Sequence, residues 1–314
     1  DVYKRQDKHV GFSHFASLGN ELDVDESDMI AYFGADPKVK VIAAYVEGIQ
    51  DGQKFIRIAS DVSKHKPIVL LKAGRTEAGA QAVSSHTGSL AGTYAAYQAA
   101  FEQAGIIEVE DLPSLFDVAW ALSCQPLPRG NKAAILTNAG GPAALASDAL
   151  AANGFELASI SAEKQAALAE KLNPAAQVAN PVDMLGGAEA EEFAHCLSTL
   201  SDDPGVDIFM PMLVPQSLVN PADIANAIVE HTQGVEKTVL ACMVGEQSIK
   251  EARAVLHANQ IPLAIFPETP GKVLGAMADY REWVSKGQSR TFDFSAEYRE
   301  KAAQYLSGLN ATVL

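Results

Sequence analysis

Short runs of apolar residues alternate along the chain with longer stretches in which apolar and polar positions repeat with a helical period. In the first third of the chain, the apolar runs predict strands at residues 39–46, 67–71 and 106–109. Helices are predicted around them at residues 25–33, 52–64, 89–104 and 112–123. Strands that are apolar along their whole length are buried on both faces, which is typical of a parallel sheet covered by helices.

The alternation restarts after residues 125–131, where two prolines and a glycine are typical of a linker between domains. Strands are then predicted at residues 132–137, 155–160, 206–214, 237–243 and 262–266. Helices are predicted at residues 142–153, 162–172, 189–200, 221–231, 247–258 and 270–283. This is the inventory of a flavodoxin-like, doubly wound domain, so we predict an α/β chain of two such domains in tandem.

The first of these domains looks incomplete. Only residues 12–18 precede its first predicted helix, and no glycine-rich turn from a strand into a helix lies upstream. We therefore expect an N-terminally truncated sheet with a free edge or a gap. The chain begins without Met and ends in a polar, then amphipathic stretch, so we interpret it as a fragment of a longer protein.

Composition narrows the class of protein. The chain is 48% hydrophobic and 20% charged, which excludes a disordered tail, a collagen-like fibre and a coiled coil. A net charge of −15 argues against nucleic acid or an anionic membrane as partner. Cys124, Cys196 and Cys242 are dispersed and fit neither a disulfide framework nor a zinc site, which favours a cytoplasmic protein without a bound metal. No apolar run approaches the roughly 18 residues that a membrane helix needs.

The most informative segment is the sequence SSHTGSLAG at residues 84–92, which contains His86. It follows a strand closely, in what we predict to be a polar, glycine-rich loop at the carboxyl edge of the sheet, where ligands of such folds bind. Neutral imidazole is a nucleophile near pH 7 and can accept a phosphoryl group. The small Gly88 and Ser89 would let a phosphate approach the backbone. The alternative is an exposed loop histidine that caps the following helix.

A second candidate is the strand-to-helix turn at residues 136–145, which contains Gly140 and Gly141. We expect Pro142 to be the first helical residue. Free amides at a helix N-terminus, together with the helix dipole, form an anion site, so Asn138, Gly140 and Gly141 are candidate phosphate ligands. The alternative is that the tight turn itself needs glycine. The segment is neither a dinucleotide fingerprint nor a Walker A sequence.

Glu47 is the third candidate, because it stands directly after the first predicted strand. Its carboxylate could accept a hydrogen bond from an imidazole and fix the tautomer of that ring. The alternative is a solvated carboxylate at a strand end. Residues 180–183 (NPVD) predict a structured turn, in which we give Asp183 a structural role.

Taken together, these segments resemble the NDP-forming acyl-CoA synthetases, the family that includes ADP-forming acetyl-CoA synthetase and is related to succinyl-CoA synthetase. The matching segments are residues 17–20, 45–49, 71–76, 86–92, 137–142 and 180–183. The His86 motif is highly specific in this context, whereas the Gly-Gly turn alone is not. The resemblance divides the chain into a start that does not match the family (1–10), a truncated phosphohistidine ligase domain (11–124), the linker (125–131), a second ligase domain (132–284) and a connector (285–314).

The resemblance also implies an activity, that of an acid–thiol ligase. The family reaction is acyl-CoA + ADP + phosphate ⇌ acid + CoA + ATP, through an acyl phosphate and a phosphohistidine. His86 would carry the phosphoryl group, Glu47 would support His86, and Gly140 and Gly141 would open one of two helices whose N-termini hold the phosphohistidine. CoA, ATP or ADP with Mg²⁺, and a small carboxylic acid are the expected substrates, with no covalently bound cofactor.

The family's CoA-binding domain and ATP-grasp portion, the latter a separate subunit in some members, are missing from this chain. We therefore expect the fragment to be inactive alone and oligomeric when complete. The alternative is a non-catalytic, regulatory module of a protein acetyltransferase. In that class the phosphorylatable histidine tends to be lost, so the presence of His86 together with Glu47 favours the ligase. A plain acyl-CoA or nucleotide sensor is a third hypothesis, but no complete site for either ligand is visible.

Overall fold

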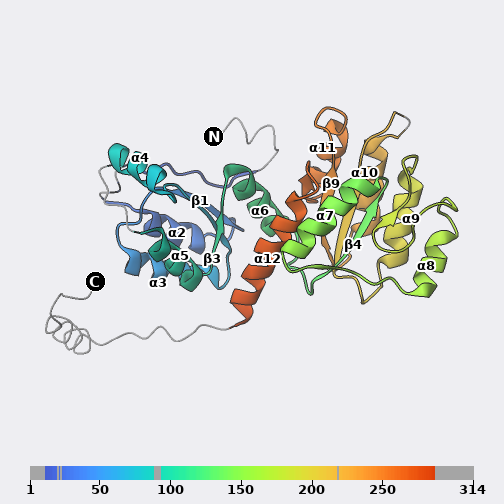
Figure 1. Ribbon diagram of the computed structural model, residues 1–314. Helices are drawn as coiled ribbons and strands as arrows, with labels where there is room; N and C mark the ends of the chain where they lie inside the picture. Colours follow the sequence, from blue (N-terminus) through green and yellow to red (C-terminus); the bar gives the residue numbers. More distant parts are fainter. Residues whose placement is uncertain (1–10, 20, 22, 88–92, 218, 287–314) are drawn as a thin grey trace.

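The computed structural model describes residues 11–286 apart from 20, 22, 88–92 and 218, and for residues 84–87 it describes the backbone alone. The described chain forms two parallel sheets, each accompanied by helices (Figure 1). This confirms the predicted α/β fold with two domains in tandem. No helix among the described residues is long and apolar enough to cross a membrane.

The first sheet has the order β1-β2-β3 in the described part of the chain, and both pairings are parallel. Its strands are β1 (Ile42–Val46), β2 (Ile68–Lys72) and β3 (Ile106–Val109). The accompanying helices are α2 (Glu26–Ala35), α3 (Gly52–Ser63), α4 (Glu77–Thr87), α5 (Tyr94–Ala104) and α6 (Leu112–Cys124). The three predicted strands are confirmed, and β2 is buried along its whole length because its apolar side chains alternate between the clusters on the two faces of the sheet.

The second sheet has the order β10-β9-β7-β4-β5, with β6 beside β4 and β8 beside β7. Its strands are β4 (Lys132–Thr137), β5 (Glu156–Leu157), β6 (Val182–Asp183), β7 (Ile208–Leu213), β8 (Thr238–Val239), β9 (Ala241–Met243) and β10 (Leu263–Ala264). Its helices are α7 (Gly140–Ala152), α8 (Ala162–Ala169), α9 (Ala190–Leu200), α10 (Pro221–Thr232), α11 (Lys250–Ala258) and α12 (Thr269–Ser285). The main strands follow the flavodoxin-like order, as predicted.

One strand of the second sheet was missed by the sequence prediction. The strand predicted over residues 155–160 is only β5, and β6 pairs with the second half of β4, where a turn was predicted. The side chain of Asn180 explains the change of partner. It accepts a hydrogen bond from the Ile135 N–H at 3.0 Å and donates to the carbonyls of Ala133 at 2.7 Å and Ala158 at 2.9 Å. This amide replaces ladder bonds that a longer β5 would have made.

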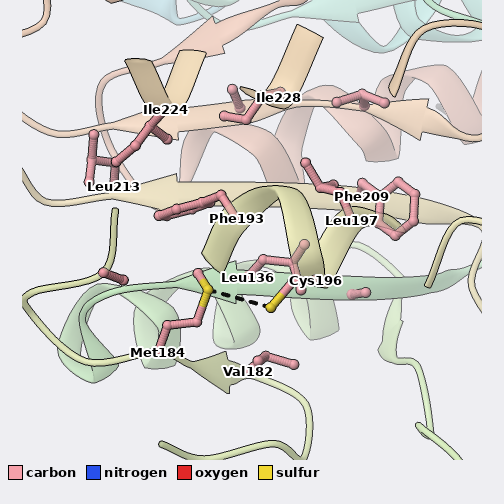
Figure 2. Close-up of a cluster of buried hydrophobic side chains, with 14 of the residues drawn as sticks. Leu136, Val182, Met184, Phe193, Cys196, Leu197, Phe209, Leu213, Ile224 and Ile228 are labelled. Carbon is pink, nitrogen blue, oxygen red and sulfur yellow. Dashed lines mark hydrogen bonds between the residues drawn. The ribbon is translucent and has the colours of Figure 1, made fainter. Parts of the chain in front are cut away.

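The outer face of the second sheet is covered by α8, α9, α10 and α11 over an apolar cluster (Figure 2). Phe193 and Leu197 of α9 pack there with Leu136 of β4 and Phe209 of β7. Cys196 lies in the same cluster, with its Sγ 3.5 Å from the sulfur of Met184. Burial raises the pKa of the thiols of Cys124, Cys196 and Cys242 to about 12, so they act as small apolar packing groups.

A shared core joins the two sheets. One buried cluster contains Val69 and Ile107 of the first sheet, Ile135 and Met210 of the second, and Met277 of α12. Figure 1 shows α12 between the two halves of the molecule, where it also packs against α6 and α7. The other faces of the two sheets carry separate clusters. The helices α6, α7 and α12 therefore form a common layer between the two domains.

Two contacts at the end of α12 fasten it to the first domain. The Tyr280 hydroxyl donates a hydrogen bond to the carbonyl of Ser63 at 2.9 Å. The ring of Trp283 lies so close to Gly105 that an added Cβ would stand 2.5 Å from ring carbons. Gly105 caps α5 with a φ of 69°, which favours glycine. The relative placement of the domains thus depends on side chains near the end of α12.

The buried carboxyl group of Glu26 predicts that stability depends on pH. Its side chain is 6% exposed, its Oε1 accepts a hydrogen bond from the Ser27 hydroxyl at 3.2 Å, and its Oε2 has no hydrogen-bond partner among the described residues. Burial, reinforced by the carboxylates of Glu21 and Asp25, raises the pKa of Glu26 to about 7. Because the folded state prefers the protonated form, stability is full at low pH and is lost as the pH rises through about 7.

Replacing Glu26 with glutamine is expected to remove this decline. The variant should be more stable than the wild type at pH 8 by about 1–3 kcal/mol and should differ little at pH 5. Urea unfolding at both pH values measures the difference, and Glu102→Gln at an exposed position of α5 serves as the control. A parallel pH dependence in wild type and Glu26→Gln would contradict the assignment.

Candidate functional site

Polar groups gather at the carboxyl ends of β1 and β2. Glu47 follows β1 directly and is half-buried, and its Oε1 accepts a hydrogen bond from the Tyr45 hydroxyl at 3.4 Å. Lys72 is the last residue of β2 and is 4% exposed. Its ammonium donates to the carbonyl oxygen of Glu47 at 2.9 Å and to that of Ala73. The ends of the two strands are therefore tied together by one buried cation.

The neighbouring strand β3 adds a second carboxylate to this edge. Glu108 accepts a hydrogen bond from the Tyr94 hydroxyl at 2.8 Å, and the ammonium of Lys72 lies 4.5 Å from the ring centroid of Tyr97. Burial lowers the pKa of Lys72, while the carboxylates of Glu108 and Glu47 oppose that shift. Lys72 was not among the residues predicted from the sequence, although a lysine that ends an otherwise apolar strand is a visible signal.

His86 lies in the last turn of α4, not in a loop. The predicted loop was wrong because residues 77–82 are mainly good helix formers, and because the Thr76 hydroxyl accepts the N–H of Gly79 at 3.1 Å at the start of the helix. Since α4 follows β2, it leaves the same edge of the sheet at which Glu47 stands. Gly88 and Ser89 lie outside the described residues, so their contacts with phosphate stay predictions. The next helix, α5, begins at Tyr94 rather than at residue 89.

In the second domain, α7 begins at Gly140 after the N-cap Ala139, which has no side-chain cap. Pro142 is the third helical residue, not the first as predicted. The Ala143 N–H bonds to the Ala139 carbonyl at 3.4 Å, so the N–H groups of Gly140 and Gly141 precede the first intrahelical bond. They point out of the helix N-terminus, as an anion site requires.

The backbone angles and the surroundings of Gly140 and Gly141 distinguish between the two interpretations of this turn. Neither glycine has a positive φ, so the turn does not need glycine for its conformation. A Cβ on Gly140 would stand 3.1 Å from Oδ2 of Asp183, whereas a Cβ on Gly141 would meet nothing within 4 Å. The backbone of Gly141 is thus open to an approaching group. This observation favours the anion site over the alternative of a turn that merely needs glycine.

Asp183 and Asn138 hold the loops around the start of α7. Asp183 accepts a hydrogen bond from the Leu185 N–H at 3.0 Å, in line with its predicted structural role. Asn138 is 2% exposed, and its side-chain amide exchanges two hydrogen bonds of 2.9 Å with the backbone of Val214. Its side chain joins the ends of β4 and β7, and a direct contact with phosphate stays a prediction.

A cavity of about 420 Å³ lies at the same carboxyl edge of the second sheet, between the loops after β6 and β7. Its lining residues are Gly186, Gly187, Gln216, Ser217 and Val219. This cavity was not predicted from the sequence, although the glycine pair shortly after residues 180–183 is a visible signal. Among the described residues, no group of three histidine, cysteine or acidic side chains is arranged to hold a metal ion.

Both halves of the chain match known protein families. Residues 2–122 match the family described as succinyl-CoA ligase like flavodoxin domain, and residues 133–288 match the family described as ligase-CoA domain. A similar protein is acetate–CoA ligase [ADP-forming] I of Archaeoglobus fulgidus, which is 39% identical over 96% of this chain and 43% of its own length. Subunit alpha of acetate–CoA ligase [ADP-forming] II of Pyrococcus furiosus is 38% identical over 91% of this chain and 63% of its own.

A solved structure shares the fold. It is the dinucleotide forming acetyl-coenzyme A synthetase 1 of Ca. Korarchaeum cryptofilum in complex with phosphate and ADP, with a TM-score of 0.84 and 34% identity over 92% of this chain and 63% of that one. The chain thus spans from about two fifths to under two thirds of the length of these proteins. These relatives are named as ligases or synthetases, and they give no support to the alternative of a regulatory acetyltransferase module.

Proposed function

Because the chain belongs to the NDP-forming acyl-CoA synthetases, we propose that it is the part of an ADP-forming acid–thiol ligase that relays the phosphoryl group. The observation that carries the proposal is the edge of the first sheet, where Glu47 follows β1 next to Ala73, the start of the chain segment that leads into α4 and His86. The enzyme would interconvert acyl-CoA, ADP and phosphate with a carboxylic acid, CoA and ATP.

In this proposal a ring nitrogen of His86 attacks the phosphorus of an acyl phosphate. A P–N bond forms, the P–O bond breaks, and its electron pair leaves with the carboxylate of the acid. The terminal oxygen of ADP then attacks the same phosphorus, and the P–N bond breaks to return neutral imidazole and release ATP. Glu47 accepts a hydrogen bond from the second ring nitrogen, which fixes the tautomer and stabilises the positive charge on the phosphorylated ring.

The N-terminus of α7 is the proposed seat of the phosphoryl oxygens in the second domain. The N–H groups of Gly140 and Gly141 would donate to them, and the helix dipole would favour their negative charge. The carboxylate of Asp183 lies on the side of Gly140, so the phosphoryl group would approach from the open side at Gly141. Asn138 contributes by holding the loop in place.

The remaining parts of the reaction would come from outside this chain. We propose that a CoA-binding domain and an ATP-grasp domain or subunit complete the enzyme as an oligomer in the cytoplasm, with nucleotide bound as its Mg²⁺ complex and a small carboxylic acid as substrate. The name "subunit alpha" of the Pyrococcus furiosus relative supports a division into separate chains. We expect the 314-residue chain to be inactive by itself. Transfer of labelled phosphate from ATP to the assembled enzyme tests the proposal.

Replacing Gly141 with valine is expected to block the anion site. The branched side chain would occupy the open space through which the phosphoryl group approaches, while α7 keeps helical backbone angles. Loss of a charged hydrogen bond corresponds to a rate of phosphohistidine formation about ten- to hundredfold lower. Rapid-quench labelling of the assembled enzyme measures this rate. Ala144→Val, at an exposed position of the same helix, is the control, and an equal effect of both changes would contradict the site.

A further inference from the structure

Lys72 occupies an unusual place for a lysine. It ends the buried strand β2 and is 4% exposed. Two acceptors face its ammonium, the carbonyl of Glu47 at 2.9 Å and the carbonyl of Ala73, and the face of the Tyr97 ring lies on a further side. Burying an ammonium is unfavourable unless its donors are satisfied. The fold maintains this cation at the edge where Glu47 stands.

The carboxylate of Glu47 is held less firmly than its backbone. Within the described chain, the group that bonds to it is the Tyr45 hydroxyl at 3.4 Å, which is a long hydrogen bond from an exposed side chain. The carbonyl of the same residue receives the shorter bond from Lys72. Glu108, the second carboxylate near Lys72, is already bonded to Tyr94 at 2.8 Å. Among the contacts of the described residues, those of the main chain therefore set the position of Glu47.

We propose that Lys72 is a positioning residue of the phosphoryl-transfer site, whose ammonium fixes the main chain at Glu47 and Ala73 and so determines where the Glu47 carboxylate meets the imidazole of His86. This inference rests on the proposed function. The segment that leads into α4 starts at Ala73, so the same ammonium anchors both the residue that supports the histidine and the segment that leads to it. Small displacements of such groups slow a reaction without preventing substrate binding.

Lys66 provides a matched control at the opposite end of the same strand. It stands two residues before the start of β2, is 7% exposed, and donates to the carbonyls of Phe33 at 2.8 Å, Gly34 at 2.8 Å and Asp36 at 2.7 Å. It is a buried ammonium that ties backbone carbonyls together in the same domain. Its removal should cost stability as the removal of Lys72 does, but it lies away from the carboxyl edge.

The experiment compares Lys72→Met and Lys66→Met in the assembled enzyme, with each variant also combined with Glu47→Gln. We expect Lys72→Met to lower kcat and the single-turnover rate of His86 phosphorylation about ten- to hundredfold, with KM for the acyl substrate nearly unchanged. In the Glu47→Gln background, the same change should alter the rate by no more than about twofold, because it acts through Glu47. Lys66→Met should leave the rates unchanged while lowering the thermal midpoint of unfolding.

Several outcomes would overturn the positioning role. Equal rate losses for Lys72→Met in both backgrounds, or a loss of the same size for Lys66→Met, would show a general structural effect. If Lys72→Met does not fold, Lys72→Gln keeps an uncharged N–H donor for a carbonyl, and we expect a smaller loss that is again absent with Glu47→Gln. If the wild type takes up the phosphate label and the Lys72 variant takes it up equally fast, this inference alone is refuted. If the wild type takes up no label, the proposed function is refuted as well.

Discussion

Replacement of His86 by asparagine is expected to abolish phosphoryl labelling of the assembled enzyme. Asparagine has no nitrogen lone pair that can form a P–N bond, so the relay between acyl phosphate and ADP would stop rather than slow. The label in the wild type should be stable to base and lost in acid, as expected for a phosphoramidate. The position in the last turn of α4, with mainly exposed or half-buried residues before it in the helix, indicates that the change leaves the fold intact.

Two companion variants make this result specific. Glu47→Gln should slow labelling about ten- to hundredfold without abolishing it, because one charged hydrogen bond is lost while the nucleophile remains. His65→Asn, at an exposed position of the same domain, should be labelled as fast as the wild type. Label that persists in His86→Asn would refute the assignment of the phosphohistidine, and an unlabelled wild type would return the regulatory alternative to consideration.

Replacement of Gly105 by alanine is expected to cause a large loss of stability. Two penalties add at this position, because a φ of 69° strains any residue with a Cβ and because that Cβ would stand 2.5 Å from ring carbons of Trp283. The strain and the overpacking together should cost about 2–5 kcal/mol of the free energy of unfolding. Denaturant unfolding of the 314-residue chain measures this quantity directly.

Gly154 separates the two penalties. It follows α7 with a φ of 80°, and a Cβ there would meet nothing within 4 Å, so Gly154→Ala adds strain without a collision. It should cost only about 1–2 kcal/mol. The excess loss in Gly105→Ala should shrink when Trp283 is also changed to alanine. Equal losses for the two glycine variants would show that the packing of Trp283 on Gly105 contributes little to the docking of α12.

The strands and most helices were predictable because the residues within each element are sufficient to determine its secondary structure. The strand β2 is apolar at four consecutive positions before Lys72, and α6 begins at an aspartate cap followed by a proline within its first turn. The errors occur where a distant group decides the structure. Asn180 bonds to three backbone groups of other segments, and this interaction, which no local pattern contains, replaces part of β5 by β6.

The positions of the candidate residues were predictable only in part. Glu47 was predicted at a strand end, and the amides of Gly140 and Gly141 at a helix N-terminus, because parallel strands and helix starts have regular positions. Asn138 was predicted to contact phosphate from its place in the motif, but its side chain bonds to Val214, which follows β7 and lies 76 residues away in the sequence. Lys72 was missed for the same reason, since its partner Glu47 is 25 residues distant.

The contact of α12 with the first domain joins segments that are far apart in the sequence, and this has a consequence for synthesis on the ribosome. Tyr280 bonds to Ser63 across 217 residues, so the part of the first domain that α12 covers stays open until nearly all described residues have been translated. At ordinary elongation rates this interval lasts roughly 10–40 s. During that time α6 packs on this side of the first sheet, while the surface at Gly105 that Trp283 covers later is exposed on the nascent chain and is a target for a chaperone. Slow translation of the second half should therefore lower the yield of native protein more than slow translation of the first.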